Sequence, residues 1–264
     1  MALAVEMCGI FGFALKKPIA MVRIFEVLEK LEVHQYPKEK LPLGGYGAGI
    51  ALLKDHKIVL QKVGSVDGSP ANRLSQIFQI SEASTLIAHV RMPLRKYMRT
   101  AKYAEAAQPY VAECSSGFSV ASVHNGKVKN YMEIREELGS SHTFESEKIG
   151  LIDSEVIPHY FEDQVMGRFG AKEALVKLFS RAEGTSSACL LQVLENDVYL
   201  HFIHKGKTRG LTIWKNDRDE LIFCSRKESL SDEFKKILDQ GKFSETVSIP
   251  WRKDQSFVGS FCWK

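Results

Sequence analysis

The order of short apolar runs along the chain constrains its fold more than any other feature of the sequence. Runs with the length and composition of buried strands lie at 8–14, 50–53, 57–63, 85–90, 118–123, 187–194, 198–203, 211–214 and 221–224. Helical spacing of apolar residues predicts helices at 19–33, 72–80, 130–138, from Asp153 onward, and at 171–181 and 232–238. Asn130 and Glu133 have the spacing of a capping box at the start of the third of these helices. Strands and helices come in blocks, without the regular alternation of a doubly wound sheet. We therefore expect an α+β fold, with two mainly antiparallel sheets packed face to face and covered by helices.

Bulk composition excludes several other classes of protein. The chain has 264 residues, of which 44% are hydrophobic and 26% charged, as in ordinary globular proteins. That length can bury a sizeable core, and we expect one large domain over 8–264 instead of two small ones. The formal net charge is only +4, with both signs interspersed, so a nucleic-acid partner is not expected.

The cysteines and the apolar runs bear on location and cofactors. Cys8, Cys114, Cys189, Cys224 and Cys262 form no C-x-x-C pair and have no nearby histidine at metal-ligand spacing. We interpret them as reduced thiols of a cytoplasmic protein and expect no metal and no organic cofactor. Residues 1–15 lack the basic start and cleavage pattern of a signal peptide, and no apolar run approaches the roughly 20 residues that span a bilayer. Secretion and membrane insertion are therefore not expected.

Cys8 begins the run Cys8-Gly9-Ile10-Phe11-Gly12, and its position near the start of the chain decides its chemistry. A free cysteine is more often inert packing than a nucleophile. If Met1–Met7 were removed, however, Cys8 would carry a free α-amine, with a reference pKa of about 7.7 to 8.0, beside its thiol. One residue would then hold both nucleophile and base, whereas a retained leader would leave an amide nitrogen that is not basic.

Four further motifs follow Cys8 in order and change the interpretation. They are His89-Val90-Arg91, Gln108-Pro109-Tyr110, His124-Asn125-Gly126-Lys127-Val128-Lys129-Asn130 and Asp153-Ser154-Glu155-Val156-Ile157. Together with the cysteine motif, they resemble the glutaminase domain of class II glutamine amidotransferases, from Cys8 to about Leu230. The resemblance implies a four-layer αββα sandwich of the N-terminal nucleophile hydrolase type.

The resemblance also implies catalytic roles. Cys8 would attack the side-chain amide of glutamine to give a γ-glutamyl thioester and ammonia, and its own α-amine would take the thiol proton. The side-chain amide of Asn125 and the backbone N–H of Gly126 would bind the oxyanion of the tetrahedral intermediate. The alternative is that Asn125-Gly126 forms only a tight turn. His124 is interpreted as a packing or hydrogen-bonding residue and not as a base.

Two charged residues would bind the remaining groups of glutamine. The planar guanidinium of Arg91 suits the α-carboxylate, and the carboxylate of Asp153 suits the α-ammonium. The alternatives are a solvated surface charge for Arg91 and an N-cap of the following helix for Asp153.

Three departures from the family pattern leave alternatives open. Met1–Met7 precede Cys8, either as an over-called start or as a propeptide. After its arginine the family usually has Trp, a small residue and Thr, whereas residues 92–96 of this chain are Met-Pro-Leu-Arg-Lys. Gln108 stands where His or Asn is common in the family. The substrate could then be another γ-glutamyl amide or peptide. A retained leader would make the chain a non-catalytic glutamine-sensing subunit.

The fate of the ammonia is a further expectation. Only a short tail with Trp251, Phe257, Phe261 and Trp263 follows the family resemblance, so we expect either a partner protein that accepts the ammonia or hydrolysis for its own sake. The aromatic residues of this tail are expected to belong to the core.

Overall fold

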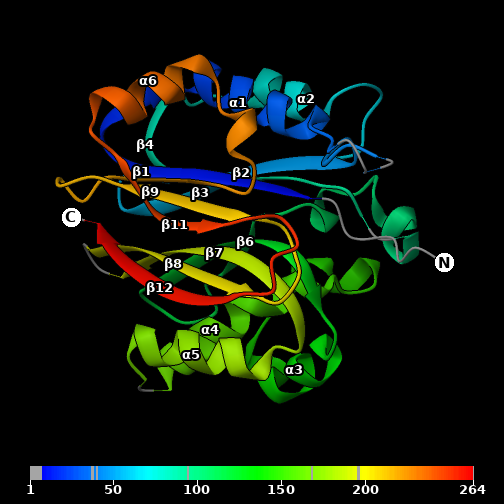
Figure 1. Cartoon of the computed structure of the whole chain (residues 1–264). Coiled ribbons are helices and arrows are strands. Elements are labelled where there is room, and N and C mark those ends of the chain that lie inside the picture. The colour runs from blue at the N-terminus through cyan, green and yellow to red at the C-terminus, as the bar shows by residue number, and fades with distance from the viewer. Residues whose placement is uncertain are drawn as a thin grey trace.

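A computed structural model of the protein describes residues 8–36, 39, 41–93, 95–167, 169–194 and 197–263. The predicted leader Met1–Met7, and Leu94 of the unusual loop, lie outside the described residues. Figure 1 shows two sheets packed face to face, with helices over both outer faces. No helix in the described part of the chain has the length and apolar character to cross a bilayer.

The first sheet has the strand that follows Cys8 at its middle. Its strands lie in the order β11 (Ser244–Ile249), β9 (Leu211–Lys215), β10 (Leu221–Cys224), β1 (Gly9–Ala20), β4 (Glu82–Val90), β2 (Gly47–Lys54) and β3 (Lys57–Gly64). All of the neighbouring pairs are antiparallel. Strand β1 is therefore hydrogen-bonded on both sides, by β10 and β4, which fixes the segment that follows Cys8.

The second sheet is smaller and also antiparallel throughout. Its strands lie in the order β12 (Ser256–Trp263), β8 (Asp197–Lys205), β7 (Gly184–Leu194), β6 (Phe118–Val128) and β5 (Tyr110–Ala112). The motif His124-Asn125-Gly126 lies inside β6, where Gly126 is paired with Ser186 of β7. The alternative, in which Asn125-Gly126 forms only a tight turn, is therefore wrong, because the strand continues through these residues.

Helices cover the two outer faces and complete four layers. Over the first sheet lie α1 (Met21–Val33), α2 (Pro70–Ile77) and α6 (Asp232–Gln240), and over the second lie α3 (Tyr131–Leu138), α4 (Val156–Met166) and α5 (Ala171–Arg181) (Figure 1). The predicted α+β class and αββα arrangement are confirmed. The helices begin and end within a few residues of the expected ranges.

The first part of β1, residues 9–15, is buried on both faces, which explains its continuous apolar sequence. Phe11 and Phe13 pack against Phe234 of α6, with ring centroids 5.0 and 5.7 Å apart. Ile10 and Ala14 belong instead to the apolar cluster between the two sheets. Since side chains alternate along a strand, Cys8 lies on the same side as Ile10, toward the second sheet.

Two local expectations need correction. Asn130 and Glu133 have the spacing of a capping box, but the Asn130 side chain makes no capping bond to α3. It donates to the carbonyl of Arg181 at 3.0 Å and accepts from the N–H of Glu183 at 2.9 Å, because the chain leaving α5 passes beside it. The last two strands, β11 and β12, were also not expected. Phe257, Phe261 and Trp263 of β12 pack against the intersheet cluster, as a core interpretation requires.

Candidate active site

Cys8 lies directly before β1 and opposite the end of β4. Its thiol contacts the backbone of Met92, with Sγ 3.4 Å from both the carbonyl oxygen and the N–H nitrogen. The side chain is buried, with 9% of its surface exposed. The sequence thus places a thiol at the head of the central strand of the larger sheet, and this strand is paired on both sides.

Gly12 explains why small residues recur in the cysteine motif. A Cβ at this position would lie 2.5 Å from the carbonyl oxygen of Leu86 and 2.5 Å from the ring of Phe223. Both neighbours belong to strands paired with β1, so neither has room to withdraw. The glycine spacing is therefore a packing requirement of the strand that carries Cys8.

One pocket brings together most of the predicted site residues. Cys8, Arg91, Gln108, His124, Gly126 and Asp153 all line it. They come from the head of β1, the end of β4, the segment before β5, the middle of β6 and the segment before α4. Motifs that are separate along the sequence thus lie around one pocket, with residues from both sheets.

Asn125 lies next to this pocket but is not among its lining residues. It follows His124 on β6, and alternation turns its side chain to the opposite face, toward the intersheet layer that contains Val123. Its side chain is 1% exposed, and neither Oδ1 nor Nδ2 has a hydrogen-bond partner among the described residues. Buried amides are nearly always satisfied, so an unpaired one is typical of a site that binds something else.

Gly126 has a backbone conformation that only glycine adopts readily. Its φ is +144°, and a Cβ there would lie 2.0 Å from the carbonyl oxygen of Thr185 on β7. A side chain at this position would push β6 away from β7. The second residue of the Asn-Gly pair is therefore required by the strand geometry at the pocket wall.

Arg91 is buried, with 4% of its surface exposed, so the surface-charge alternative is wrong. Its Nη2 donates to Thr100 Oγ1 at 3.3 Å, whereas Nη1 has no hydrogen-bond partner among the described residues. Burial lowers the pKa of the guanidinium, and nearby Tyr110, Cys8 and Asp153 act in the opposite direction. A cation with a free donor in a pocket favours an anionic ligand.

Asp153 is also buried, and its Oδ2 accepts the N–H of Val128 at 3.2 Å. The N-cap residue of α4 is Glu155, so the alternative in which Asp153 caps this helix is wrong. Burial raises the pKa of Asp153 to about 6, while Lys96 and Lys127 act to lower it. The carboxylate is ionised at neutral pH, at an energetic cost that an ammonium ligand would offset.

His124 and Gln108 hold the strand at the pocket. Nδ1 of His124 lies 2.9 Å from Ser154 Oγ, and Nε2 lies 3.2 Å from Ser186 Oγ. Burial lowers the pKa of this histidine to about 4, which fits the predicted hydrogen-bonding role. Gln108 accepts the His124 N–H at 2.6 Å and donates to its carbonyl at 3.0 Å. The departure at Gln108 thus supports the residue before Asn125.

Other lining residues were not identified from the sequence. Tyr97, Ala106 and Ile152 also face the pocket, and Ser154 does so beside Asp153. Only Ser154 had a signal, since it belongs to the Asp-Ser-Glu motif. Tyr97 lies in the irregular segment after β4, where no periodicity points to a pocket.

A cysteine at the head of a central strand, between two antiparallel sheets covered by helices, places the protein among the N-terminal nucleophile hydrolases. Residues 95–232 match the family described as "Glutamine amidotransferase domain", which is more than half of the chain. The chain belongs to the class II glutamine amidotransferases. The resemblance, and the prediction of an enzyme of this family, are confirmed.

Curated relatives and solved structures agree with this assignment. The chain is 30% identical over 237 residues to glutamine–fructose-6-phosphate aminotransferase of Listeria innocua, covering 89% of this chain and 35% of the relative. It is 31% identical over 226 residues to the enzyme of the same name from Methanosarcina mazei, covering 85% and 32%. The chain therefore spans about a third of the length of these relatives.

Two solved structures share the fold. The allosteric regulatory enzyme of purine biosynthesis matches with a TM-score of 0.63 and 18% identity, over 96% of this chain and 48% of the other. Glutamine phosphoribosylpyrophosphate amidotransferase from B. subtilis matches with a TM-score of 0.59 and 18% identity, over 96% and 49%. At this identity, the likeness concerns the fold alone.

Proposed function

We propose that the protein hydrolyses the side-chain amide of glutamine to glutamate and ammonia through a thioester on Cys8. The observation that carries this proposal is the pocket that joins Cys8 to Arg91, Gly126 and Asp153, beside the unpartnered amide of Asn125. Family membership supports the reaction class.

The reaction proceeds in two halves. The α-amine of Cys8 takes the thiol proton as Sγ attacks the amide carbon, and Asn125 Nδ2 and the Gly126 N–H donate to the resulting oxyanion. Collapse of the intermediate breaks the carbon–nitrogen bond, and the protonated amine gives its proton to the departing ammonia. Water then attacks the thioester, with the amine again as base, and glutamate leaves with the thiol restored.

Arg91 and Asp153 hold the other end of the substrate. The α-carboxylate of glutamine pairs with the guanidinium whose Nη1 has no partner among the residues that the structure describes, and the α-ammonium pairs with the Asp153 carboxylate. Both protein charges are buried, so pairing with substrate is stronger than it would be on the surface. This requirement for two opposite charges selects a free amino acid over a simple amide.

The ammonia passes to an acceptor domain or partner protein in the cytoplasm. This part of the proposal is supported by the curated relatives, which are named aminotransferases and are about three times as long as the matched region. Without such an acceptor, the chain acts as a glutaminase.

Cys8 must have a free α-amine, so the first measurement is the intact mass of the mature protein. Protein that begins at Cys8 should release glutamate from glutamine, and Cys8→Ala should abolish this release. Cys262→Ser, an exposed thiol at a distance along the chain, is the matched control. Correctly processed protein that releases no glutamate, with or without candidate partners, would contradict the proposal. A protein that retains 1–7 and binds glutamine without turnover would instead be a sensor.

A different γ-glutamyl amide is the second candidate substrate. The observation in its favour is the unusual residue Met92, which is buried, lines the pocket and contacts the Cys8 thiol through its backbone. A comparison of kcat/KM for glutamine and for γ-glutamyl peptides separates the two. A preference for a peptide would assign the altered loop to substrate selection.

A further inference from the structure

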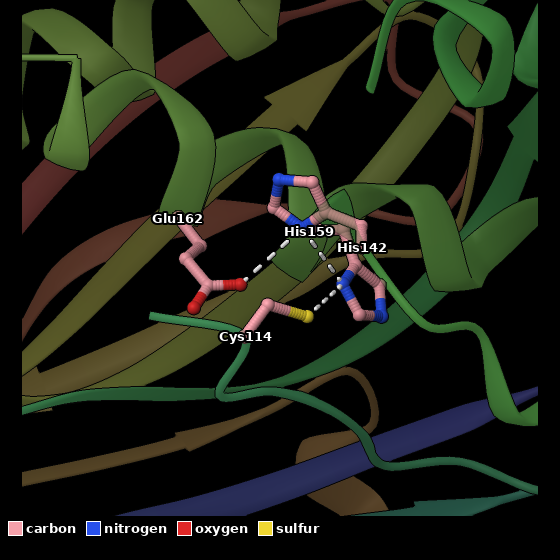
Figure 2. A group of neighbouring side chains, drawn as sticks. All are labelled: Cys114, His142, His159 and Glu162. Carbon is pink, nitrogen blue, oxygen red and sulfur yellow. Dashed lines mark hydrogen bonds and ion pairs between the residues drawn. The ribbon is translucent and has the colours of Figure 1, made fainter. Parts of the chain in front are cut away.

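Four side chains that can bind metal meet beside α4, outside the pocket of Cys8. Cys114 comes from the loop between β5 and β6, His142 follows α3, and His159 and Glu162 lie one turn apart on α4. Figure 2 shows the four side chains turned toward one another. The histidines and the glutamate are buried, whereas Cys114 is exposed. We name this group the α4 cluster.

The spacing of the ligand atoms fits one small ion. Nδ1 of His142 lies 3.3 Å from Nδ1 of His159 and 3.4 Å from Glu162 Oε2, and Cys114 Sγ lies 3.6 Å from His159 Nδ1. Tetrahedral zinc with bonds of about 2.0–2.3 Å requires ligand atoms about 3.3–3.8 Å apart. No pair in the cluster exceeds 4.8 Å, so a side-chain movement of roughly 1 Å closes the longest edge.

Neighbouring groups orient two of these ligands, His142 and Glu162, in the way that metal sites require. Nε2 of His142 faces Asp163 Oδ1 at 3.6 Å, which favours a proton on Nε2 and leaves Nδ1 free to coordinate. The other oxygen of Glu162, Oε1, accepts the N–H of Ser115 at 2.8 Å, so Oε2 remains available. Each of these outer contacts leaves an inner atom pointing into the cluster.

We propose that Cys114, His142, His159 and Glu162 bind a structural zinc ion. Thiolate, two imidazoles and a carboxylate form a donor set that zinc accepts, and four protein ligands close its coordination sphere, as in structural sites. The exposed thiol provides the access path for the ion. The metal joins α4 to the loop after β5 and to the end of α3, and so stabilises the segment that carries Asp153.

This site was not expected from the sequence, which has no metal-binding spacing. His159 and Glu162 are three residues apart on one helix face, but the other two ligands come from separate segments. Only the packing of α3 and α4 against the second sheet brings them together. The inference does not depend on the proposed glutaminase reaction.

Metal content of the full-length protein tests the proposal. Protein purified without chelators should contain about one zinc per chain by elemental analysis, and the cobalt-substituted form should show a thiolate charge-transfer band and visible bands of tetrahedral cobalt. Cys114→Ser should remove the charge-transfer band and weaken zinc binding by about 100-fold or more. Cys262→Ser, the other exposed cysteine, should leave both unchanged.

A second variant keeps all four ligands and guards against misfolding. Asp163→Asn should lower zinc affinity by about 10–100-fold while the protein stays folded, because it weakens only the orientation of His142. Chelation should lower the melting temperature of the parent protein and of Cys262→Ser, but not that of Cys114→Ser. Protein that holds no zinc and gives no cobalt spectrum, or equal losses in both cysteine variants, would overturn the proposal. None of these readouts requires glutaminase activity.

Discussion

The pocket of Cys8 and the α4 cluster differ in how closely their polar side chains approach one another. In and beside the pocket, Arg91 Nη1 and both amide atoms of Asn125 have no partner among the described residues. In the α4 cluster, each ligand side chain lies 3.3–3.6 Å from another, although His159 Nε2 and Glu162 Oε2 also have no hydrogen-bond partner in the described part of the chain. The two regions are joined by one segment, since Asp153 immediately precedes the helix that carries His159 and Glu162.

Whether a buried polar group has a partner predicts whether its substitution affects activity or stability in this fold. An unsatisfied buried polar group costs about 1–3 kcal/mol of folding free energy, so removing it need not destabilise the protein. Removal of a hydrogen-bonded buried group should destabilise the protein, because its partners are left unpaired. Substitutions in the pocket should therefore lower activity and spare stability, and substitutions at satisfied sites should do the reverse.

Asn125 should give the largest effect. Asn125→Ala should lower kcat for glutamine hydrolysis by about 100- to 1,000-fold, because an oxyanion donor is lost. Its free energy of unfolding should stay the same or rise, since neither amide atom has a partner in the described part of the chain. Steady-state kinetics and denaturant unfolding measure the two quantities.

Asn130 is the matched control for this prediction, since it is a buried asparagine whose amide is satisfied at both ends. Asn130→Ala should destabilise the protein by about 1–3 kcal/mol with little change in kcat. If both variants lost stability equally and kept their activity, the contrast between an unpaired and a hydrogen-bonded buried amide would fail.

Arg91→Lys tests the substrate carboxylate. A lysine keeps the charge but cannot present two parallel donors, so KM for glutamine should rise by about 10- to 100-fold with a smaller change in kcat. Arg73→Lys, on the exposed face of α2, should leave KM unchanged. An unaltered KM in Arg91→Lys would remove this residue from the substrate site.

Asp153 should make glutamine binding depend on pH. Its pKa of about 6 means that the carboxylate is lost as pH falls through 6, so affinity should drop about tenfold per pH unit below that value. Calorimetric titration of Cys8→Ala isolates binding from turnover. In Asp153→Asn with Cys8→Ala, the affinity should be weak and independent of pH over this range, and a persisting pH dependence would point to another group.

The same raised pKa predicts a change in stability of defined sign. The folded state holds the Asp153 proton more tightly than the unfolded state, so the contribution of this group to stability falls as pH rises from about 4 to 6. Asp153→Asn should therefore be more stable than the parent at pH 7.5 and about equal to it below pH 4. Thermal unfolding at the two pH values measures the difference.

The sequence predicted the layers well where burial leaves a clear pattern. Strand β1 was visible because both of its faces are apolar, and the helices were visible because each has one buried face. The edge strands β11 and β12 were missed, since their burial is partial and their sequences are mixed. Asn130 was misinterpreted because a local spacing cannot reveal a partner 51 residues away, the carbonyl of Arg181.

Some residues of the candidate site were also predictable from the sequence and others were not. Cys8, Arg91, Gly126 and Asp153 were selected by motif and lie around one pocket, although their catalytic roles stay predictions. Gln108 was noted as part of a motif and as a departure from the family pattern, but not for its bonds to the His124 backbone, because these form across the fold. The α4 cluster was missed for a related reason, since its ligands come from three segments that are joined only by tertiary packing.

The segment that holds β11 and β12 has a consequence for biosynthesis. Residues 244–263 supply the edge strand of the first sheet and then, after 250–255, the edge strand of the second. Until these residues leave the ribosome, β9 and β8 each have a row of unpaired backbone groups, and such open edges promote association between nascent chains. Both sheets are therefore completed only when this segment has been translated. A chain whose translation stops before residue 244 would have an unpaired edge in each sheet.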